Sequence, residues 1–481
     1  MSSIKKKFVS GVVWESFGRF SALGIQFVVT IIIARLLTPE QFGVIGLLTV
    51  FIALGQIFLD SGFSQALIQK KDATRLDLST IYFLNIFLGI VIYSLLYLCS
   101  PYIAEFYDMP ELTNYARVLF LIIPINSFGL IQNVIIQKEL AFKKTALASL
   151  LSAVFSGIVG ILMAYKGYGI WALVGQQVTI HASRTLLYII QRRWLPIFKV
   201  SFGVIKEMFG FSINLLAHSV VNVTMKNIYV LVIGKFFPVA QVGYYNQASK
   251  FEEVSAATIS QVVLKVSFPA LVQKLDQPTY LRSAYQKIFS TTIYIIAPLM
   301  FFLMIIAEPM FRFLLTEKWL PAVPYFQALG LYGMLLPILQ ISYNLYKLFR
   351  KGRTLLVIDI IRHALVVISI FLTIQYGVLY MLYGFVASTF IMCIANLVVS
   401  GKLINLSLIE QSSTIFPYYT IAFIAAFIVY FLPTHEYDLI TVAYKALIFG
   451  SIYIIMSKIL NLEGFKEVML IFKSFKQKLK K

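Results

Sequence analysis

Residues 31–43 read IIIARLLTPEQFG, and residues 231–243 read LVIGKFFPVAQVG. In both segments an apolar run ends at a cation, Arg35 or Lys235, and a second apolar run begins at Gln-x-Gly. The match resumes at residues 66–70 (ALIQK) and 270–274 (ALVQK). Each copy therefore predicts a pair of membrane helices joined by a short turn, and the pair occurs twice.

The composition agrees with a membrane protein. Hydrophobic residues make up 59% of the 481 residues and charged residues only 13%, with a mean hydropathy of +0.83. A soluble domain carries about 25% charged residues to cover its surface. Because the two cysteines are far apart in apolar stretches, neither a disulfide framework nor a cysteine metal site is expected. The net charge of +20 does not indicate nucleic acid here, because its placement between spans explains it.

A membrane helix needs about 20 mostly apolar residues. Fourteen stretches meet this need, at residues 14–37, 42–66, 81–102, 116–137, 146–166, 168–190, 210–234, 243–271, 288–308, 323–346, 354–376, 378–400, 415–432 and 439–460. Six spans separate the two repeat copies, so both copies have the same orientation. The predicted fold is all-α, with two six-helix lobes related by a parallel pseudo-two-fold repeat and a trailing helix pair.

The predicted domains follow from these spans. The N-lobe covers residues 1–200, the C-lobe 201–402, the trailing pair 403–462, and a basic amphipathic tail 463–481. The tail carries apolar residues at helical spacing between lysines, which is typical of a helix on an anionic membrane surface. A solvated basic tail is the alternative.

Lys and Arg residues set the orientation of the spans. With the N-terminus in the cytoplasm, the predicted outer loops carry only Lys166, Lys235, Arg312 and Lys318, whereas the cytoplasmic segments carry most of the 41 Lys and Arg residues. Three lysines precede the first span without a small-residue cleavage site, so this span is expected to stay as an anchor. Both termini are therefore predicted to be cytoplasmic.

Polar residues inside the spans are costly and mark cavities or partners. The seventh span carries four at intervals of four, and Gln26 in the first span is the repeat equivalent of Lys226. We predict a water-filled cationic cavity between the lobes that binds a large polar anion. Its candidate substrate-binding residues are Arg19, Gln26, Asn214, His218, Asn222, Lys226 and Lys250. Candidates for coupling to an ion are Glu15, Asp60, His218, Glu252, Glu253 and Asp359.

Structural interpretations stay open for several of these residues. Glu15 and Arg19 are spaced for a local ion pair near the cytoplasmic face. Arg184 is expected to snorkel to the membrane surface, as is Lys265. Asp359 is also spaced to pair with Arg362 or His363 and lock two helices together.

No enzyme signature is present in the sequence. It contains no GxxxxGK[ST] loop, no HExxH helix and no paired-carboxylate nucleotide-sugar motif. The loops are too short to form a catalytic domain. We therefore expect a transporter that needs no metal or cofactor.

Short motifs identify a resemblance to a family. Residues 35–43 (RLLTPEQFG), 60–63 (DSGF) and 68–70 (IQK) resemble the opening signature of bacterial polysaccharide and O-antigen flippases. These belong to the multidrug/oligosaccharidyl-lipid/polysaccharide exporter superfamily. Residues 137–140 (QKEL) with Phe142, and 317–319 (EKW), resemble the branch with colanic acid and teichuronic acid exporters.

The resemblance implies alternating access in the bacterial inner membrane. The cargo would be a polyprenyl-pyrophosphate-linked oligosaccharide used for surface polysaccharide or lipopolysaccharide, moved with the help of a proton or sodium gradient. Cavity cations would hold the pyrophosphate, with Arg19, Lys226 and Lys250 as candidates. Polysaccharide polymerase and chain-length proteins are candidate partners. The alternatives are a multidrug/cation antiporter of the same superfamily and, from another class, a membrane glycosyltransferase or polysaccharide polymerase.

Overall fold

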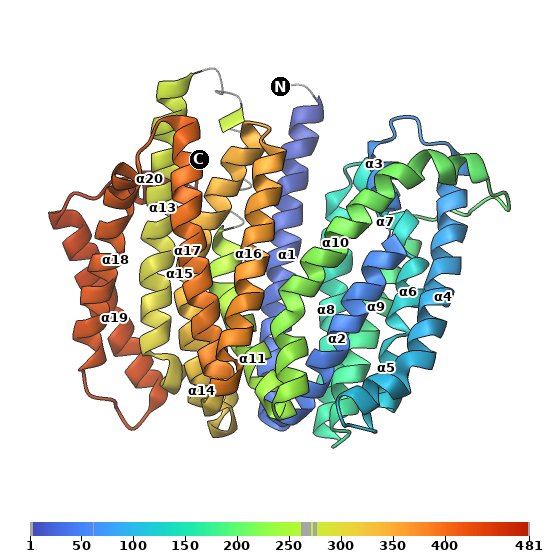
Figure 1. The fold of residues 1–481 in the computed structure, drawn as a ribbon, viewed down its shortest axis with the longest axis horizontal. Helices are drawn as coiled ribbons and strands as arrows, with labels where there is room; N and C mark the ends of the chain where they lie inside the picture. The colour runs from blue at the N-terminus through green and yellow to red at the C-terminus, as the bar shows by residue number, and fades with distance from the viewer. Residues whose placement is uncertain (1–2, 61, 261–270, 273–276, 480–481) are drawn as a thin grey trace. The chain divides into compact units, whose positions relative to one another are not determined.

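The part of the chain that the structure describes is helical and contains no strand (Figure 1). This computed structural model describes residues 3–60, 62–260, 271–272 and 277–479. The side chains of residues 3–13, 15–16, 211–212, 214–215, 471–472 and 474–479 are outside this description. Glu15, Asn214 and Lys265 therefore lie outside the described side chains, as does part of the second ALVQK copy.

The helices follow one another in a simple order. Their bounds are α1 (Ser3–Leu36), α2 (Pro39–Asp60), α3 (Phe63–Gln69), α4 (Arg75–Phe106), α5 (Leu112–Leu119), α6 (Ile122–Ser127), α7 (Leu130–Lys138), α8 (Phe142–Tyr165), α9 (Ile170–Gln191), α10 (Phe202–Phe236), α11 (Val239–Glu252), the π-helical turn η1 (Glu253–Ala257), α13 (Pro278–Ile305), α14 (Ala307–Leu315), the 3₁₀ turn η2 (Glu317–Ala322), α15 (Val323–Leu348), α16 (Gly352–Thr373), the 3₁₀ turn η3 (Ile374–Tyr376), α17 (Val378–Ile404), α18 (Leu408–Tyr430), α19 (Asp438–Ile459) and α20 (Glu463–Leu479).

Eleven helices of the described chain are long and apolar enough to cross a membrane. A twelfth crossing forms if the pair Leu112–Ser127 and Leu130–Lys138, bent by 42°, counts as one span. Of the other two expected spans, 168–190 forms the less apolar helix α9, and 243–271 falls partly outside the described residues. The protein is therefore a multi-pass membrane protein, and fourteen crossings stay a prediction.

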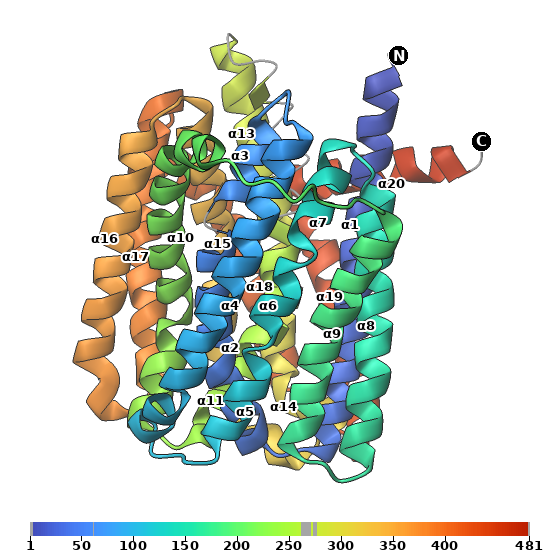
Figure 2. The same cartoon turned by 90° about the vertical axis from the view of Figure 1, so that its right-hand side faces the viewer.

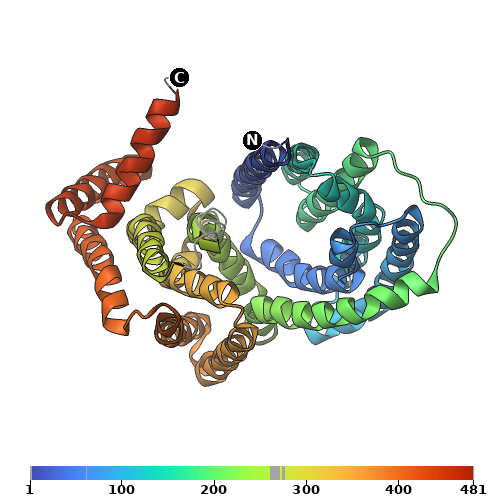
Figure 3. The same cartoon turned by 90° about the horizontal axis from the view of Figure 1, so that it is seen from above.

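The chain folds into two compact units, unit 1 (Met1–Asn246) and unit 2 (Gln247–Lys481). In unit 1, α8 packs between α1 and α9, and α2 packs against α4, α9 and α10. Seen from above, α2 separates the α1–α8 side of unit 1 from α10 (Figure 3). The lobe boundaries at residues 200, 402 and 462 stay predictions, because these units do not test the repeat symmetry.

Unit 2 is built around α13 and α15. Helix α15 packs against α13 and α17, α13 packs against α18, and α19 packs against α18 and α14. Buried side-chain hydrogen bonds join these helices: Tyr285 Oη donates to Gln411 Oε1 at 3.1 Å, and Tyr346 Oη donates to Asn396 Oδ1 at 3.0 Å. These four buried side chains are thus paired with one another between helices.

The amphipathic tail begins as a docked helix. Helix α20 packs against α13, where Lys287 Nζ lies 2.8 Å from Glu467 Oε1, and Gly464 N at its start donates to Tyr418 Oη of α18 at 3.0 Å. Phe465 and Val468 pack onto the apolar core of unit 2. Its predicted position on the inner leaflet stays a prediction.

The repeated segments give matching helix ends. Helices α1 and α10 end at Leu36 and Phe236, and α2 and α11 begin at Pro39 and Val239. Each of the two Gln-x-Gly glycines lies close to the backbone at the start of the other copy's helix. A Cβ atom on Gly43 would lie 2.1 Å from Val239 O, and one on Gly243 would lie 2.0 Å from Pro39 O. This reciprocal approach is the local geometry that a two-fold axis produces, and its extension to whole lobes stays a prediction.

The span that begins with α2 is broken before the IQK motif of residues 68–70. Gly62 adopts φ 76°, a left-handed conformation that glycine accepts without a steric penalty, and α3 begins after it. Helices α3 and α7, both labelled in the upper part of Figure 2, pack against each other. Lys138 Nζ, from the QKEL motif, donates to Leu67 O at 3.0 Å and Lys70 O at 2.5 Å. The two motifs are thus joined by a lysine that caps the end of α3.

Lys70 itself joins three segments. Its Nζ lies 3.0 Å from Glu207 Oε2 and 3.3 Å from Asp77 Oδ1. The hydrogen bond with Glu207 raises the pKa of Lys70 above its ordinary value, although partial burial opposes the shift. Asp77 also forms a capping box with Thr74 at the start of α4.

We expect Lys138→Met to lower the free energy of unfolding of the purified protein by about 1–3 kcal/mol, because two carbonyl groups lose a charged donor. A lower thermal unfolding midpoint in detergent would measure this loss. Lys199→Met is the control, since Lys199 is an exposed lysine of the connection before α10. Equal midpoints for the two variants would contradict the capping role.

Candidate functional site

Two neighbouring cavities lie inside unit 1. The larger has a volume of about 810 Å³ and is lined by α2, α3, α6, α7, α9 and α10. The smaller, of about 470 Å³, is lined by α1, α7, α8 and α9. Both are lined by Asn133, Arg184 and Tyr188. The three shared residues make the cavities a single candidate site with two compartments.

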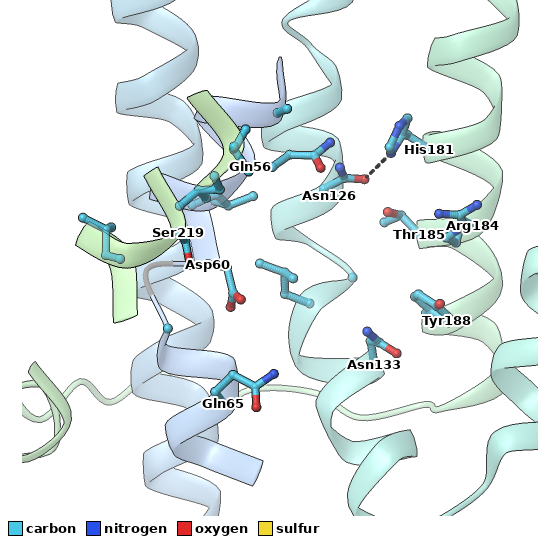
Figure 4. A pocket seen from close by; sticks show the side chains of 18 of the residues that line it. Gln56, Asp60, Gln65, Asn126, Asn133, His181, Arg184, Thr185, Tyr188 and Ser219 are labelled. Atoms are coloured by element: carbon cyan, nitrogen blue, oxygen red, sulfur yellow. Dashed lines mark hydrogen bonds between the residues drawn. The ribbon is translucent and has the colours of Figure 1, made fainter. Parts of the chain in front are cut away.

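The break between α2 and α3 forms one wall of the larger cavity. Asp60 ends α2, and its Oδ1 accepts a hydrogen bond from Ser64 N at 3.3 Å. This hydrogen bond satisfies a backbone donor at the start of α3. Gln56 and Gln65 line the cavity on either side of the break. Figure 4 shows Asp60 and Gln65 across the cavity from the α9 side chains.

The bend between α6 and α7 provides the middle of the site. Asn126 lies before the bend and Asn133 after it, and both line the larger cavity. Gly129, at the bend, allows close packing, since a Cβ there would lie 3.2 Å from Thr185 Cα. Figure 4 shows the two asparagines between the α2–α3 wall and α9.

Helix α9 presents a continuous polar face. His181, Arg184, Thr185 and Tyr188 all line the larger cavity, and their spacing of three and four residues places them on one helix face. His181 Nδ1 lies 3.1 Å from Asn126 Oδ1. Because an amide oxygen only accepts, this hydrogen bond forms in the tautomer that carries the proton on Nδ1.

The smaller cavity is lined by Arg19, Gln26, Gln137, Thr145 and Ser149, with Arg184 from α9. Two guanidinium groups therefore line it, and no carboxylate among the described side chains does. The larger cavity adds the carboxylate of Asp60. Over the described side chains the site carries a net positive charge, which favours an anion.

Two polar atoms in the wall indicate unused binding capacity. Arg184 Nε and Asn133 Oδ1 are buried and have no hydrogen-bond partner among the described residues. Buried polar groups are normally paired, so an unpaired donor and acceptor at one site point to a ligand or ordered water. A guanidinium is well suited to phosphate, which it binds through two parallel hydrogen bonds.

Several predicted site residues line these cavities and others do not. Arg19 and Gln26 line the smaller cavity, and Asp60 lines the larger one. Arg184, for which the sequence favours snorkelling, lines both. The sequence signal for Arg184 is the polar spacing of residues 177, 181 and 184 in the sixth predicted span. No periodicity indicates Asn126 or Asn133, which depend on the α6–α7 bend.

The polar stripe of the seventh predicted span consists of Asn214, His218, Asn222 and Lys226. Its described side chains line neither cavity. Helix α10 contributes Leu216, Ser219 and Val223 to the larger cavity. His218 and Asn222 each precede one of these by one residue and so point about 100° away around the helix. Asn222 Nδ2 donates to His218 O at 2.8 Å, and Lys226 is exposed. Their role in a cavity between lobes stays a prediction.

The remaining candidates lie in unit 2. Glu252 is 6% exposed, and its Oε1 would lie 3.2 Å from a Cβ on Gly333 of α15. Lys250 is half-buried, and Glu253 is exposed at the start of η1. Asp359 Oδ1 accepts from Tyr343 Oη at 3.0 Å and from Arg362 Nη2 at 3.2 Å. The pair with Arg362 is therefore formed, but within α16, and the contact that joins two helices is the one with Tyr343 of α15.

Among the described residues, no group of three or more His, Cys, Asp or Glu side chains is arranged to hold a metal ion. The chemistry available in unit 1 is hydrogen bonding and charge: guanidinium groups for phosphate oxygens, and amides and hydroxyls for polar groups of a ligand. Arrangements of this kind bind and orient a ligand.

Comparisons with known proteins identify a family and several relatives of this chain. Residues 32–324 match the family described as polysaccharide biosynthesis protein. The teichuronic acid biosynthesis protein TuaB of Bacillus subtilis (strain 168) is 29% identical over 355 residues, 73% of either chain. The lipopolysaccharide biosynthesis protein WzxC of Escherichia coli (strain K12) is 28% identical over 337 residues, 69% of this chain and 68% of that relative.

Solved structures show which fold the chain adopts. The lipid II flippase MurJ, in an inward closed conformation, superimposes with a TM-score of 0.72 at 16% identity, over 96% of this chain and 100% of MurJ. An inward-facing multidrug resistance MATE transporter gives a TM-score of 0.63 at 16% identity, over 80% and 94% of the two chains. The resemblance seen in the motifs is confirmed. The chain belongs to the polysaccharide biosynthesis protein family and has the fold of the multidrug/oligosaccharidyl-lipid/polysaccharide exporter superfamily.

Proposed function

We propose that this protein is an alternating-access flippase that moves a polyprenyl-pyrophosphate-linked oligosaccharide or polysaccharide precursor across the bacterial cytoplasmic membrane. The observation that carries the proposal is the position of Arg19 and Arg184 in the wall of one cavity, with Arg184 Nε buried and unpaired among the described residues. A pyrophosphate presents several acceptor oxygens and negative charge, which two guanidinium groups match.

The uncharged lining supports a glycan next to the phosphates. Gln56, Gln65 and Asn126 line the larger cavity. Amide groups both donate and accept, as sugar hydroxyls do. Tyr188 adds an aromatic ring at the junction of the two compartments. We infer that the phosphates bind near Arg19 and Arg184 and that the first sugars extend into the larger cavity, while the polyprenyl chain stays in lipid.

A proton or sodium gradient is the proposed driving force. Asp60 is the ion-coupling candidate in unit 1, since it is the one described carboxylate that lines the larger cavity. Glu252 and Asp359 are the candidates in unit 2, with Glu253 next to η1. Both termini are proposed to be cytoplasmic, and polysaccharide polymerase and chain-length proteins are proposed partners.

A multidrug/cation antiporter of the same superfamily is the second candidate, and the likeness of this fold to MATE transporters favours it. A cationic drug requires an acidic site, whereas the described lining of both cavities has two arginines and one aspartate. A membrane glycosyltransferase or polymerase is the candidate from another class. It would leave new glycosidic bonds as a product.

One reconstitution experiment separates these functions. Purified protein in liposomes receives a labelled lipid-linked glycan, with an imposed proton gradient, a sodium gradient or none. We expect transfer of the label between leaflets without new glycosidic bonds, accelerated by one of the gradients. Bond formation would identify an enzyme, and export of a cationic dye without glycan transfer would identify an antiporter.

A further inference from the structure

A second, apolar groove lies between α4 and α10 at the end of unit 1 predicted to face outward. It has a volume of about 590 Å³, and its wall is formed by residues such as Phe51, Cys99, Ile103, Phe106 and Val232. We call it the α4–α10 groove. Apart from Lys235 and the hydroxyl groups of Tyr102 and Tyr107, this lining is apolar, so it offers few hydrogen bonds to a sugar or a peptide backbone.

One cation interrupts the apolar wall. Lys235, in the last turn of α10, lines the groove. Its Nζ donates to Phe106 O at 2.5 Å, lies 4.7 Å from the centre of the Phe106 ring, and lies 3.5 Å from Asp108 Oδ2. An apolar wall with a single ammonium at one end is complementary to an amphiphile with an apolar chain and an anionic head.

The ion pair with Asp108 does not block such a ligand. The Asp108 side chain is 86% exposed, and pairs between exposed charges contribute little because water screens them. A phosphate carries more charge than a carboxylate and presents several acceptor oxygens. It can therefore replace Asp108 at Lys235 while the hydrogen bond to Phe106 O remains.

The groove shares its helices with the candidate site. Helix α10 lines the larger cavity through Val223 and the groove through Lys235, and α2 lines the cavity through Asp60 and the groove through Phe51. Lys235 follows Val223 by about 12 residues of helix, which is about 18 Å along the axis. Along α10 the groove is thus displaced from the cavity by roughly half of a membrane's hydrocarbon layer of about 30 Å, and it lies on a different face of that helix.

We propose that the α4–α10 groove binds the lipid end of the transported molecule on the predicted outer side: its polyprenyl chain packs against Phe51 and Val232, and a phosphate oxygen accepts a hydrogen bond from Lys235. The identity of this ligand rests on the proposed flippase function. The groove would hold the lipid carrier after transfer, before it returns to the bilayer.

Cys99 provides a reporter inside the groove. It is exposed, whereas the other cysteine, Cys393, is buried. The experiment uses the full-length Cys393→Ala protein in nanodiscs of zwitterionic lipid and measures the rate of maleimide alkylation of Cys99. Long-chain polyprenyl monophosphate, the matching uncharged polyprenol, and phosphatidylglycerol are titrated separately.

We expect polyprenyl monophosphate to protect Cys99, and polyprenol to protect it only at about tenfold higher concentration, as fits the loss of one charge-assisted hydrogen bond. Lys235→Gln should weaken protection by the phosphate about tenfold, and Lys235→Arg should restore it. Lys166→Gln is the matched control, because it removes an exposed cation predicted on the same side but outside the groove.

Three results would overturn the proposal: no protection by polyprenyl monophosphate, equal protection by phosphatidylglycerol, or equal weakening by Lys166→Gln and Lys235→Gln. Val232→Trp tests the groove without changing charge and should abolish protection by filling it. If the phosphate protects Cys99 but the protein flips no glycan, the proposed function is contradicted while the groove is still supported as a lipid-binding site. Flipping without protection would contradict the groove alone.

Discussion

Replacing Arg19 and Arg184 together with Gln is expected to slow transfer of a lipid-linked glycan by about a hundredfold or more, since each charge-assisted hydrogen bond contributes about 1.5–3 kcal/mol. Glutamine keeps a donor but loses the charge and the paired N–H groups that match two phosphate oxygens. The rate is measured as leaflet transfer of labelled glycan in liposomes, at equal amounts of folded protein.

Arg184→Lys separates charge from geometry in this experiment. Lysine keeps the positive charge but binds phosphate as a point charge. We therefore expect Arg184→Lys to transfer glycan more slowly than the wild type and faster than Arg184→Gln. Transfer by the double Gln variant at the wild-type rate would refute the assignment of the phosphate site to the unit 1 cavities.

Lys226→Gln tests whether the phosphates bind in the observed cavities of unit 1 or in the cavity predicted between the lobes. Lys226 lines neither cavity of unit 1, although the four-residue stripe makes it the strongest candidate in the sequence. If the phosphates bind at Arg19 and Arg184, Lys226→Gln should change transfer by less than about tenfold, because no charge-assisted hydrogen bond to the phosphates is lost. A much larger loss of transfer, like that of the double Gln variant, would favour the cavity predicted between the lobes instead.

The contrast between Lys226 and Arg184 shows what sequence periodicity provides. The hydropathy pattern locates spans because it depends on the chain alone. Polar spacing likewise places His181 and Arg184 on one face of a helix. Which neighbour that face meets depends on packing between distant segments. The polar stripe therefore makes Lys226 the strongest candidate in the sequence, although Lys226 lies outside the two cavities. For Arg184, which lines both cavities, the sequence instead favours a position at the membrane surface.

Breaks in helices limit sequence prediction in a second way. The apolar segments 42–66 and 116–137 each read as one span, yet the chain turns at Gly62 and bends at Gly129. Hydropathy averages over such positions. The candidate site depends on both breaks, because Asp60 ends α2 at one and Asn133 follows the other. The motif DSGF marks the first break, and no motif in the sequence marks the second.

A methyl group on either Gln-x-Gly glycine is expected to be strongly destabilising. Alanine favours a helix over glycine by about 1 kcal/mol, so Gly43→Ala would stabilise α2 if the position were open. Its Cβ, however, would lie 2.1 Å from Val239 O, and that of Gly243→Ala 2.0 Å from Pro39 O. Backbone oxygens cannot rotate away. We expect each variant to lower the free energy of unfolding by about 3 kcal/mol, the upper part of the range for overpacking.

Thermal unfolding in detergent measures this loss, with Gly24→Ala as the control because a Cβ on Gly24 of α1 meets no atom within 4 Å. Gly24→Ala should unfold at or above the wild-type temperature. The double variant supplies a stricter test of reciprocity. Once one methyl group has separated α2 from α11, the second meets a neighbour that has already moved away. The free energy of unfolding lost in the double variant should therefore be clearly smaller than the sum of the two single losses. Full additivity would mean that Gly43 and Gly243 pack independently, which would remove the local evidence for a two-fold relation between the repeats.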